Sequence, residues 1–155
     1  MAEISQLTSI QKTNLSEEDI RRLESALGAK LPDDIAQFLL EFGYASFIDE
    51  GLAYIEIGTQ DSAFGQFYGK RPGVDFDPYD FNSGALRLGD GKSHYPEKSL
   101  VFAGDELGGE YFLTFSMENT GIYWMIYGGR ADYEWVCGNF AEFMSLIKID
   151  PYDDE

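Results

Sequence analysis

Cysteine, histidine and long apolar runs are all scarce in this 155-residue chain. Cys137 is the only cysteine and His94 the only histidine. A disulfide within one chain is therefore excluded, as is a structural zinc site built from several cysteines. No apolar run approaches the roughly 18 residues of a membrane span. The first residues lack the basic and apolar regions of a secretory signal, so we expect a cytoplasmic protein without a membrane partner.

Basic residues are also few, because 11 lysines and arginines stand against 28 aspartates and glutamates. The formal net charge is -17 at pH 7. Proteins bind nucleic acids and anionic membranes through cationic surfaces, so this chain is expected to bind neither. A cationic protein partner is favoured, although acidity also serves solubility alone.

The composition is otherwise that of one folded domain. Hydrophobic residues make up 44% of the chain and aromatic residues 15%, which is unlike a disordered segment. No repeat or low-complexity linker divides the sequence. We predict a single domain over residues 1–155, with its core over about residues 15–147.

Two short helices are predicted near the N-terminus. Ser16, with Asp19 three residues later, resembles a capping box, and Gly28 is typical of the residue just after a helix. Pro32 suits the first turn of a second helix, which Gly43 ends. Apolar residues recur at helical spacing in both segments, so together they predict a helical hairpin.

The later sequence predicts strands at 53–57, 100–103, 110–115 and 122–127. Residues 58–98 are so rich in Gly, Asp, Ser and Pro that no boundaries are assigned there. A last helix is predicted from Asn139, with apolar residues on one face. The order of helices, antiparallel meander sheet and closing helix predicts an α+β fold with the C-terminal helix packed on the sheet.

Motifs for chemistry are weak throughout. Gly91-Lys92-Ser93 resembles the end of a phosphate-binding loop, but the motif's first glycine is replaced by Leu86. The spacing of Asp75, Asp77 and Asp80 lacks the glycine and glutamate of a calcium-binding loop, so a solvated acidic loop is favoured.

The two residues best suited to nucleophilic or acid–base catalysis also lack supporting context. His94 lies in a polar segment without a nucleophile motif, and Cys137 follows an apolar pair, as a buried structural cysteine does. We predict no catalytic residue, no cofactor and no metal site. The aromatic-rich segment 111–127 is expected to put one face in the core and leave the other partly exposed as a contact surface.

Several segments together resemble the SUKH superfamily, also called Smi/Knr-like domains. Residues 27–35 (Leu-Gly-Ala-Lys-Leu-Pro-Asp-Asp-Ile) resemble its entry motif, and residues 100–113 are similar to its second landmark. Residues 122–124 resemble the following strand and residues 140–144 the closing helix. Position 110 departs from the pattern, since it is Glu where a shorter Asp or Asn is common.

The resemblance implies a protein that binds rather than catalyses. Many bacterial SUKH proteins are immunity proteins that neutralise a cognate toxin domain, often a nuclease, and a basic nuclease suits an acidic inhibitor. The alternative is a regulatory or protein-interaction module of this fold without a toxin partner. The acids expected to contact the partner lie in segments with few bases: Asp75, Asp77, Asp80, Asp105, Glu106, Asp132 and Glu134.

Overall fold

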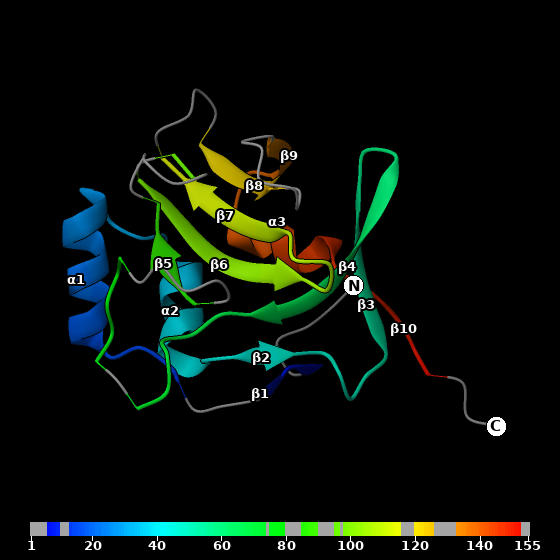
Figure 1. The fold of residues 1–155 in the computed structure, drawn as a ribbon, viewed down its shortest axis with the longest axis horizontal. Helices are drawn as coiled ribbons and strands as arrows, with labels where there is room; N and C mark the ends of the chain where they lie inside the picture. Colours follow the sequence, from blue (N-terminus) through cyan, green and yellow to red (C-terminus); the bar gives the residue numbers. More distant parts are fainter. Residues whose placement is uncertain are drawn as a thin grey trace.

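The computed structural model describes residues 6–9, 13–73, 75–79, 85–89, 95–96, 98–115, 120–125 and 133–152. Three helices and ten strands lie within these ranges (Figure 1). The helices are α1 (Glu17–Leu27), α2 (Asp33–Glu41) and α3 (Phe140–Leu146). The strands are β1 (Thr8–Ser9), β2 (Ala45–Ser46), β3 (Leu52–Ile57), β4 (Gln60–Phe67), β5 (Arg87–Leu88), β6 (Ser99–Asp105), β7 (Glu110–Thr114), β8 (Gly121–Met125), β9 (Tyr133–Cys137) and β10 (Lys148–Asp150).

Local sequence signals set the bounds of the helices. The Asp19 backbone N–H donates to the Ser16 hydroxyl and the Ser16 N–H donates to the Asp19 carboxylate, each at 3.1 Å, so the predicted capping box is present. Gly28 ends α1 in the left-handed region, at φ 70°. Asn139 caps α3 by accepting the Glu142 N–H at 2.8 Å. No helix in the described part of the chain has the length and apolar character that a membrane crossing requires.

All strand pairings are antiparallel, and the main path runs β1-β2-β4-β6-β7-β8-β9. β5 pairs with the first half of β6, β3 pairs with β4, and β10 pairs with β3. Two helices precede the meander and one follows it. The predicted α+β class, with its N-terminal helical hairpin and closing helix, is confirmed.

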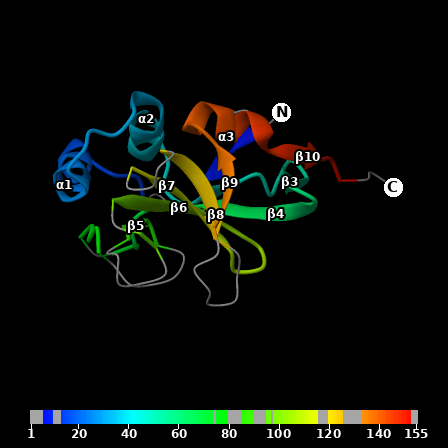
Figure 2. The same ribbon diagram turned by 90° about the horizontal axis from the view of Figure 1, so that it is seen from above.

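One face of the sheet is covered by α2 and α3 (Figure 2). Phenylalanine rings pack against one another in the core between them. Phe38 of α2 lies 4.7 Å from Phe67 of β4 between ring centroids, and Phe143 of α3 lies 5.2 Å from Phe102 of β6. Burial of these rings stabilises the packing of the helices on the sheet. Tilted and edge-on arrangements at these spacings add a favourable electrostatic interaction between the rings.

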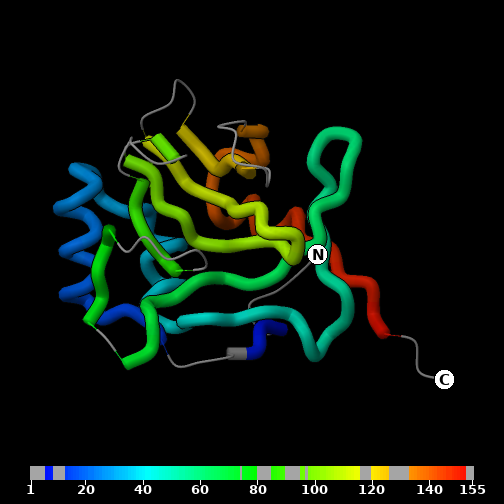
Figure 3. Tube along the Cα trace, viewed as in Figure 1, coloured from blue at the N-terminus to red at the C-terminus, as the bar shows by residue number. Residues whose placement is uncertain are grey.

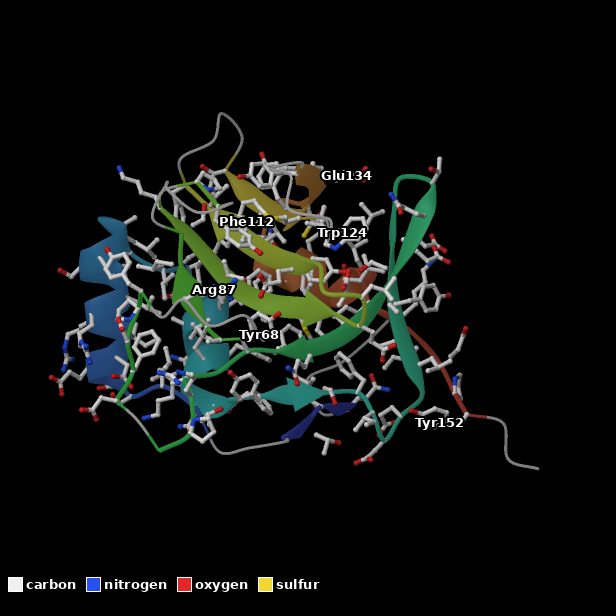
Figure 4. The ribbon with its side chains drawn as sticks, viewed as in Figure 1. Tyr68, Arg87, Phe112, Trp124, Glu134 and Tyr152 are labelled. Carbon is white, nitrogen blue, oxygen red and sulfur yellow. The ribbon has the colours of Figure 1, made fainter. Side chains whose placement is uncertain are left out.

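The opposite face holds a buried ion pair. Arg87 of β5 donates two hydrogen bonds to Glu110 of β7, at 2.7 and 3.1 Å, and each side chain is only 11% exposed. The Tyr95 hydroxyl donates to the same carboxylate at 2.5 Å, and the Tyr68 hydroxyl is a further donor (Figure 4). Gly104 lies beneath Tyr68, where a Cβ atom would stand 2.1 Å from the Tyr68 hydroxyl.

The donors keep Glu110 ionised in this buried setting. Burial alone would raise the pKa of Glu110, but the hydrogen bonds and charge of Arg87, with the two tyrosine hydroxyls, lower it below its ordinary value. Burial and the Glu110 charge raise the pKa of Tyr68 and of Tyr95, so both stay protonated donors. Through these donors, the segments that carry Tyr68, Arg87 and Tyr95 are each bonded to Glu110 at the start of β7.

The structure fills one gap in the sequence-based prediction and corrects one expectation. Residues 58–98, for which no boundaries were predicted, contain β4 and β5. In β4 the alternation of buried and exposed residues is interrupted between Phe64 and Gln66, where the register with β6 shifts. The expected exposed face of the aromatic-rich segment is wrong for residues 110–114 and 121–125, which are all buried. Tyr95 and Tyr133 pack edge-on against Phe112 there, at 5.2 and 5.1 Å.

Substitution of Glu110 tests the buried pair. Glu110→Gln should lower the free energy of unfolding by about 3 kcal/mol at pH 7, because Arg87 stays charged and buried without a counter-ion. Urea denaturation measures the loss. Glu56→Gln is the matched control, since Glu56 pairs with Lys148 at 3.1 Å but is 57% exposed; its loss should stay below about 0.5 kcal/mol.

The same pair predicts a pH dependence. The pKa of Glu110 is lower in the folded than in the unfolded chain, so its stabilisation is present above the unfolded pKa and is lost as pH falls through the folded pKa. The stability difference between wild type and Glu110→Gln should therefore shrink as the pH is lowered from about 7 to below about 4. A difference independent of pH would contradict the assignment.

Candidate protein-interaction site

Acidic side chains gather at one end of the sheet. We use the name acidic end for four segments: the β2–β3 turn with the β3–β4 hairpin (47–64), the β6–β7 turn (105–109), the start of β9 (133–134) and the C-terminal segment (148–152). In Figure 1 they lie towards the right, except the start of β9, which lies near the top centre. These segments carry one basic residue, Lys148, and eight acidic residues. The acids are Asp49, Glu50, Glu56, Asp61, Asp105, Glu106, Glu134 and Asp150.

The other end of the molecule is mixed in charge. Seven of the eight basic residues that the structure describes lie there, on α1, on the α1–α2 connection and at the adjoining ends of β4, β5 and β6. They are Arg21, Arg22, Lys30, Lys70, Arg71, Arg87 and Lys98. A cationic partner approaching the molecule would therefore be drawn towards the acidic end.

An open cleft of about 260 Å³ lies in the acidic end. β4 pairs with β2 only at Phe67 and with β3 only as far as Ala63. On the side of β4 that faces β2 and β3, no strand in the described ranges pairs with residues 64–66. The cleft opens at this gap in the strand pairing. Its walls come from the β2–β3 turn, the β6–β7 turn and the C-terminal segment; they include Phe47, Ile48, Leu52, Gly65, Glu106 and Tyr152.

Two glycines allow these walls to approach one another. Gly65 lies at the register shift of β4, where a Cβ atom would stand 3.0 Å from the carbonyl oxygen of Gly104. Gly51 has φ 144°, and a Cβ there would stand 2.2 Å from the carbonyl oxygen of Asp150. The C-terminal strand therefore runs close beside β3 and the turn before it, as the chain trace shows (Figure 3).

Three apolar side chains are exposed at the cleft, although its surroundings are acidic. Ile48 and Leu52 are each 61% exposed, and Tyr152 is 51% exposed. The Tyr152 hydroxyl donates to the Ile48 carbonyl oxygen at 2.8 Å, which holds the C-terminal wall against the β2–β3 turn. Exposed apolar groups gathered at a cleft are typical of protein-binding surfaces.

Asp105 fixes the shape of the β6–β7 turn. Its Oδ1 accepts the backbone N–H groups of Leu107 and Gly109 at 2.9 and 2.7 Å. Its Oδ2 accepts the Trp124 indole N–H at 3.0 Å and the Ser62 hydroxyl at 3.3 Å. The Asp105 carboxylate is thus engaged by four donors within the chain, and the neighbouring Glu106 is left to face solvent.

The structure brings together only part of the acidic set predicted from sequence. Asp105, Glu106 and Glu134 lie in the acidic end, and Glu134 stands near Gly58 at the tip of the β3–β4 hairpin (Figure 4). Asp75 and Asp77 are exposed towards the other end, where Asp77 accepts the Tyr79 N–H at 3.0 Å. Asp80 and Asp132 lie outside the described residues. Contact with a partner stays a prediction for all seven.

Sequence reasoning missed the other acids of this end and the cleft itself. The missed acids are Asp49, Glu50, Glu56, Asp61 and Asp150. A local signal existed for the first pair, because residues 48–52 read Ile-Asp-Glu-Gly-Leu, a turn with apolar residues on both sides. No local signal places residues 148–152 beside this turn, since that contact is made by long-range strand pairing.

Among the described residues, neither a metal-binding group of side chains nor a reactive thiol is present. No three His, Cys, Asp or Glu side chains are grouped within them so as to hold a metal ion. Burial first, and the charge of Glu142 second, raise the pKa of the Cys137 thiol to about 12. The thiol donates to the Asn139 carbonyl oxygen at 3.4 Å. Because its pKa is raised, the thiol is a poor nucleophile at neutral pH. His94 and the segment 91–93 lie outside the described residues.

The role of Asp105 predicts a contrast between neighbouring acids. Asp105→Asn should lower the free energy of unfolding by about 2 kcal/mol, because its amide NH₂ would face donors in place of an acceptor. Glu106→Gln should change it by less than about 0.5 kcal/mol. Urea denaturation followed by tryptophan fluorescence gives both values. Equal midpoints for the two variants would show that the turn does not depend on the Asp105 carboxylate.

Comparison with known proteins agrees with this architecture. A model of the SMI1/KNR4 family (SUKH-1) matches residues 14–146, a range that contains all three helices and the strands β2 to β9. No curated protein and no solved structure matches the chain. The family match covers most of the chain and agrees with the resemblance seen in the sequence motifs. The chain therefore belongs to the SMI1/KNR4 family (SUKH-1).

Proposed function

We propose that this chain is an immunity-type protein that binds and neutralises a cationic toxin domain, a basic nuclease being the expected kind, through its acidic end. Family membership is consistent with that role. The observation that carries the proposal is the charge distribution, with eight acids and one base in the acidic end. The active cleft of a nuclease must attract phosphate, so a surface of this charge would compete with nucleic acid for it.

Charge and packing would contribute differently to such a complex. Opposite charges about 4 Å apart gain only about 1 kcal/mol in water and about 4 kcal/mol at an effective dielectric of 20. The acidic end would therefore accelerate and orient the encounter, while buried apolar contacts supply much of the affinity. Neutralisation then needs no catalytic residue in this chain, because covering the toxin's active site is sufficient.

A two-step experiment tests the proposal. The purified chain is used as bait in extract of the source cells, with washes at low and then high salt, and each retained protein is then expressed in a susceptible host. We expect a basic domain that arrests growth when expressed alone and is tolerated when this chain is co-expressed. Retained partners that are harmless to the host would instead favour a regulatory module of the same fold.

With the partner purified, charge reversal at the two ends of the molecule distinguishes their roles. Glu50→Lys with Glu106→Lys should slow association at low salt by roughly tenfold and flatten its salt dependence. Glu41→Lys with Asp75→Lys changes the charge by the same amount at the other end, where both acids are exposed; its effect should stay below about twofold. Stopped-flow kinetics over a salt series measures both. Equal slowing by the two variants would show that overall charge alone is sensed.

A further inference from the structure

We propose that the cleft is an anchor site for one large apolar side chain, aromatic or leucine-like, that lysine or arginine residues flank in the partner protein. The proposal rests on the proposed function, because it specifies how the acidic end would hold a cationic partner. The cleft is a built feature of the chain, since a gap in strand pairing along β4 and three separate wall segments define it.

The size of the cleft fits a single large side chain. Its volume of about 260 Å³ exceeds the roughly 150 Å³ of an engineered cavity that binds benzene. Phe47 and Phe64 are almost fully buried, at 2% and 3% exposed, so the apolar surface open to a ligand comes from Ile48, Leu52 and Tyr152. Gly65 contributes no side chain, so the cleft reaches down to the backbone of β4. An aromatic ring or a branched aliphatic group could therefore pack against these apolar side chains and be partly removed from water there.

The rim of the cleft specifies what should flank that side chain. Glu106 lines the cleft and is exposed. Asp49 and Glu50 lie in the β2–β3 turn beside Ile48, and Asp150 precedes the wall residue Tyr152 by two positions. No lysine or arginine is among the described residues that line the cleft. Charge complementarity therefore favours a cationic segment around the anchor and disfavours an acidic one.

The walls are held in place before any partner arrives. Tyr152 is bonded to the Ile48 carbonyl, the Asp105 carboxylate holds the β6–β7 turn, and Gly65 lies against β6. A site fixed in this way loses little conformational entropy on binding. Anchors seated in such pockets are typical of the few residues that dominate interface energies.

A pair of peptides with equal charge tests the anchor directly. The probe is fluorescein-labelled Arg-Lys-Trp-Lys-Arg with an amidated C-terminus, and its twin carries Ala in place of Trp. We expect the Trp peptide to bind about tenfold more tightly, by fluorescence anisotropy, because only it carries a large apolar side chain between the basic residues, while the label is common to both peptides. Amide shifts in ¹⁵N NMR spectra should concentrate on Ile48, Leu52 and Gly65. Equal affinity of the two peptides, or shifts elsewhere, would overturn the proposal.

A substitution that adds negative charge separates packing from electrostatics. Ile48→Asp should weaken the Trp peptide by roughly tenfold, although a purely electrostatic site would bind it more tightly. Tyr79→Asp is the matched control, because Tyr79 is 46% exposed and lies towards the other end; it should leave the affinity unchanged. Leu52→Ala, which adds no charge, should weaken binding in the same direction. Unchanged affinity in both cleft variants would overturn the proposal.

Failure of the anchor and failure of the proposed function give different results. If Ile48→Asp and Leu52→Ala neutralise the captured toxin as well as wild type does, the cleft is not the anchor while the immunity role stands. If wild type neutralises none of the retained proteins, the immunity role fails, and the peptide series alone decides whether the cleft binds cationic apolar segments.

Discussion

The buried pair between Arg87 and Glu110 is the constraint on which much of this structure depends. It joins β5, which is only two residues long, to the start of β7, and it brings the hydroxyls of Tyr68 and Tyr95 to the same carboxylate. Removing charges from water is costly, so such a pair adds less to net stability than to the choice of one arrangement over others. Here it acts together with the β5–β6 pairing and the burial of Leu86 and Leu88 to fix the described residues around Arg87.

The same constraint reaches the candidate binding surface. Glu110 ends the β6–β7 turn that Asp105 begins, so the turn is held at both of its ends. Glu106 lies between these fixed points and lines the cleft. The buried Arg87–Glu110 pair and the Asp105 hydrogen bonds in the β6–β7 turn thereby determine where the exposed Glu106 carboxylate lies. The acidic end is consequently a defined surface and not merely a region of high charge.

Sequence patterns predicted the elements whose signals are local. The Ser16 and Asn139 caps, the Gly28 stop and the apolar strands around 100–103 and 110–115 gave the helices and the centre of the meander. β4 was not predicted because its alternation of buried and exposed residues breaks at Gly65. β5 and β10 were not predicted because they are too short to show a periodic pattern. Glu110 was noticed only as an unusual residue, since its partner Arg87 lay in an unassigned stretch. The cleft could not be foreseen because its walls meet only through long-range strand pairing.

The C-terminal wall of the cleft has a consequence for how partners change during evolution. Tyr152 and β10 lie beyond residue 146, where the family match ends, whereas the helices and the meander lie within it. A few substitutions in this last segment could reshape the cleft without disturbing the phenylalanine core or the Arg87–Glu110 pair. One wall residue of the cleft, Tyr152, thus lies outside the matched range, whereas the other walls lie within it. Descendants of one ancestral domain could exchange partners rapidly while their architecture stays constant.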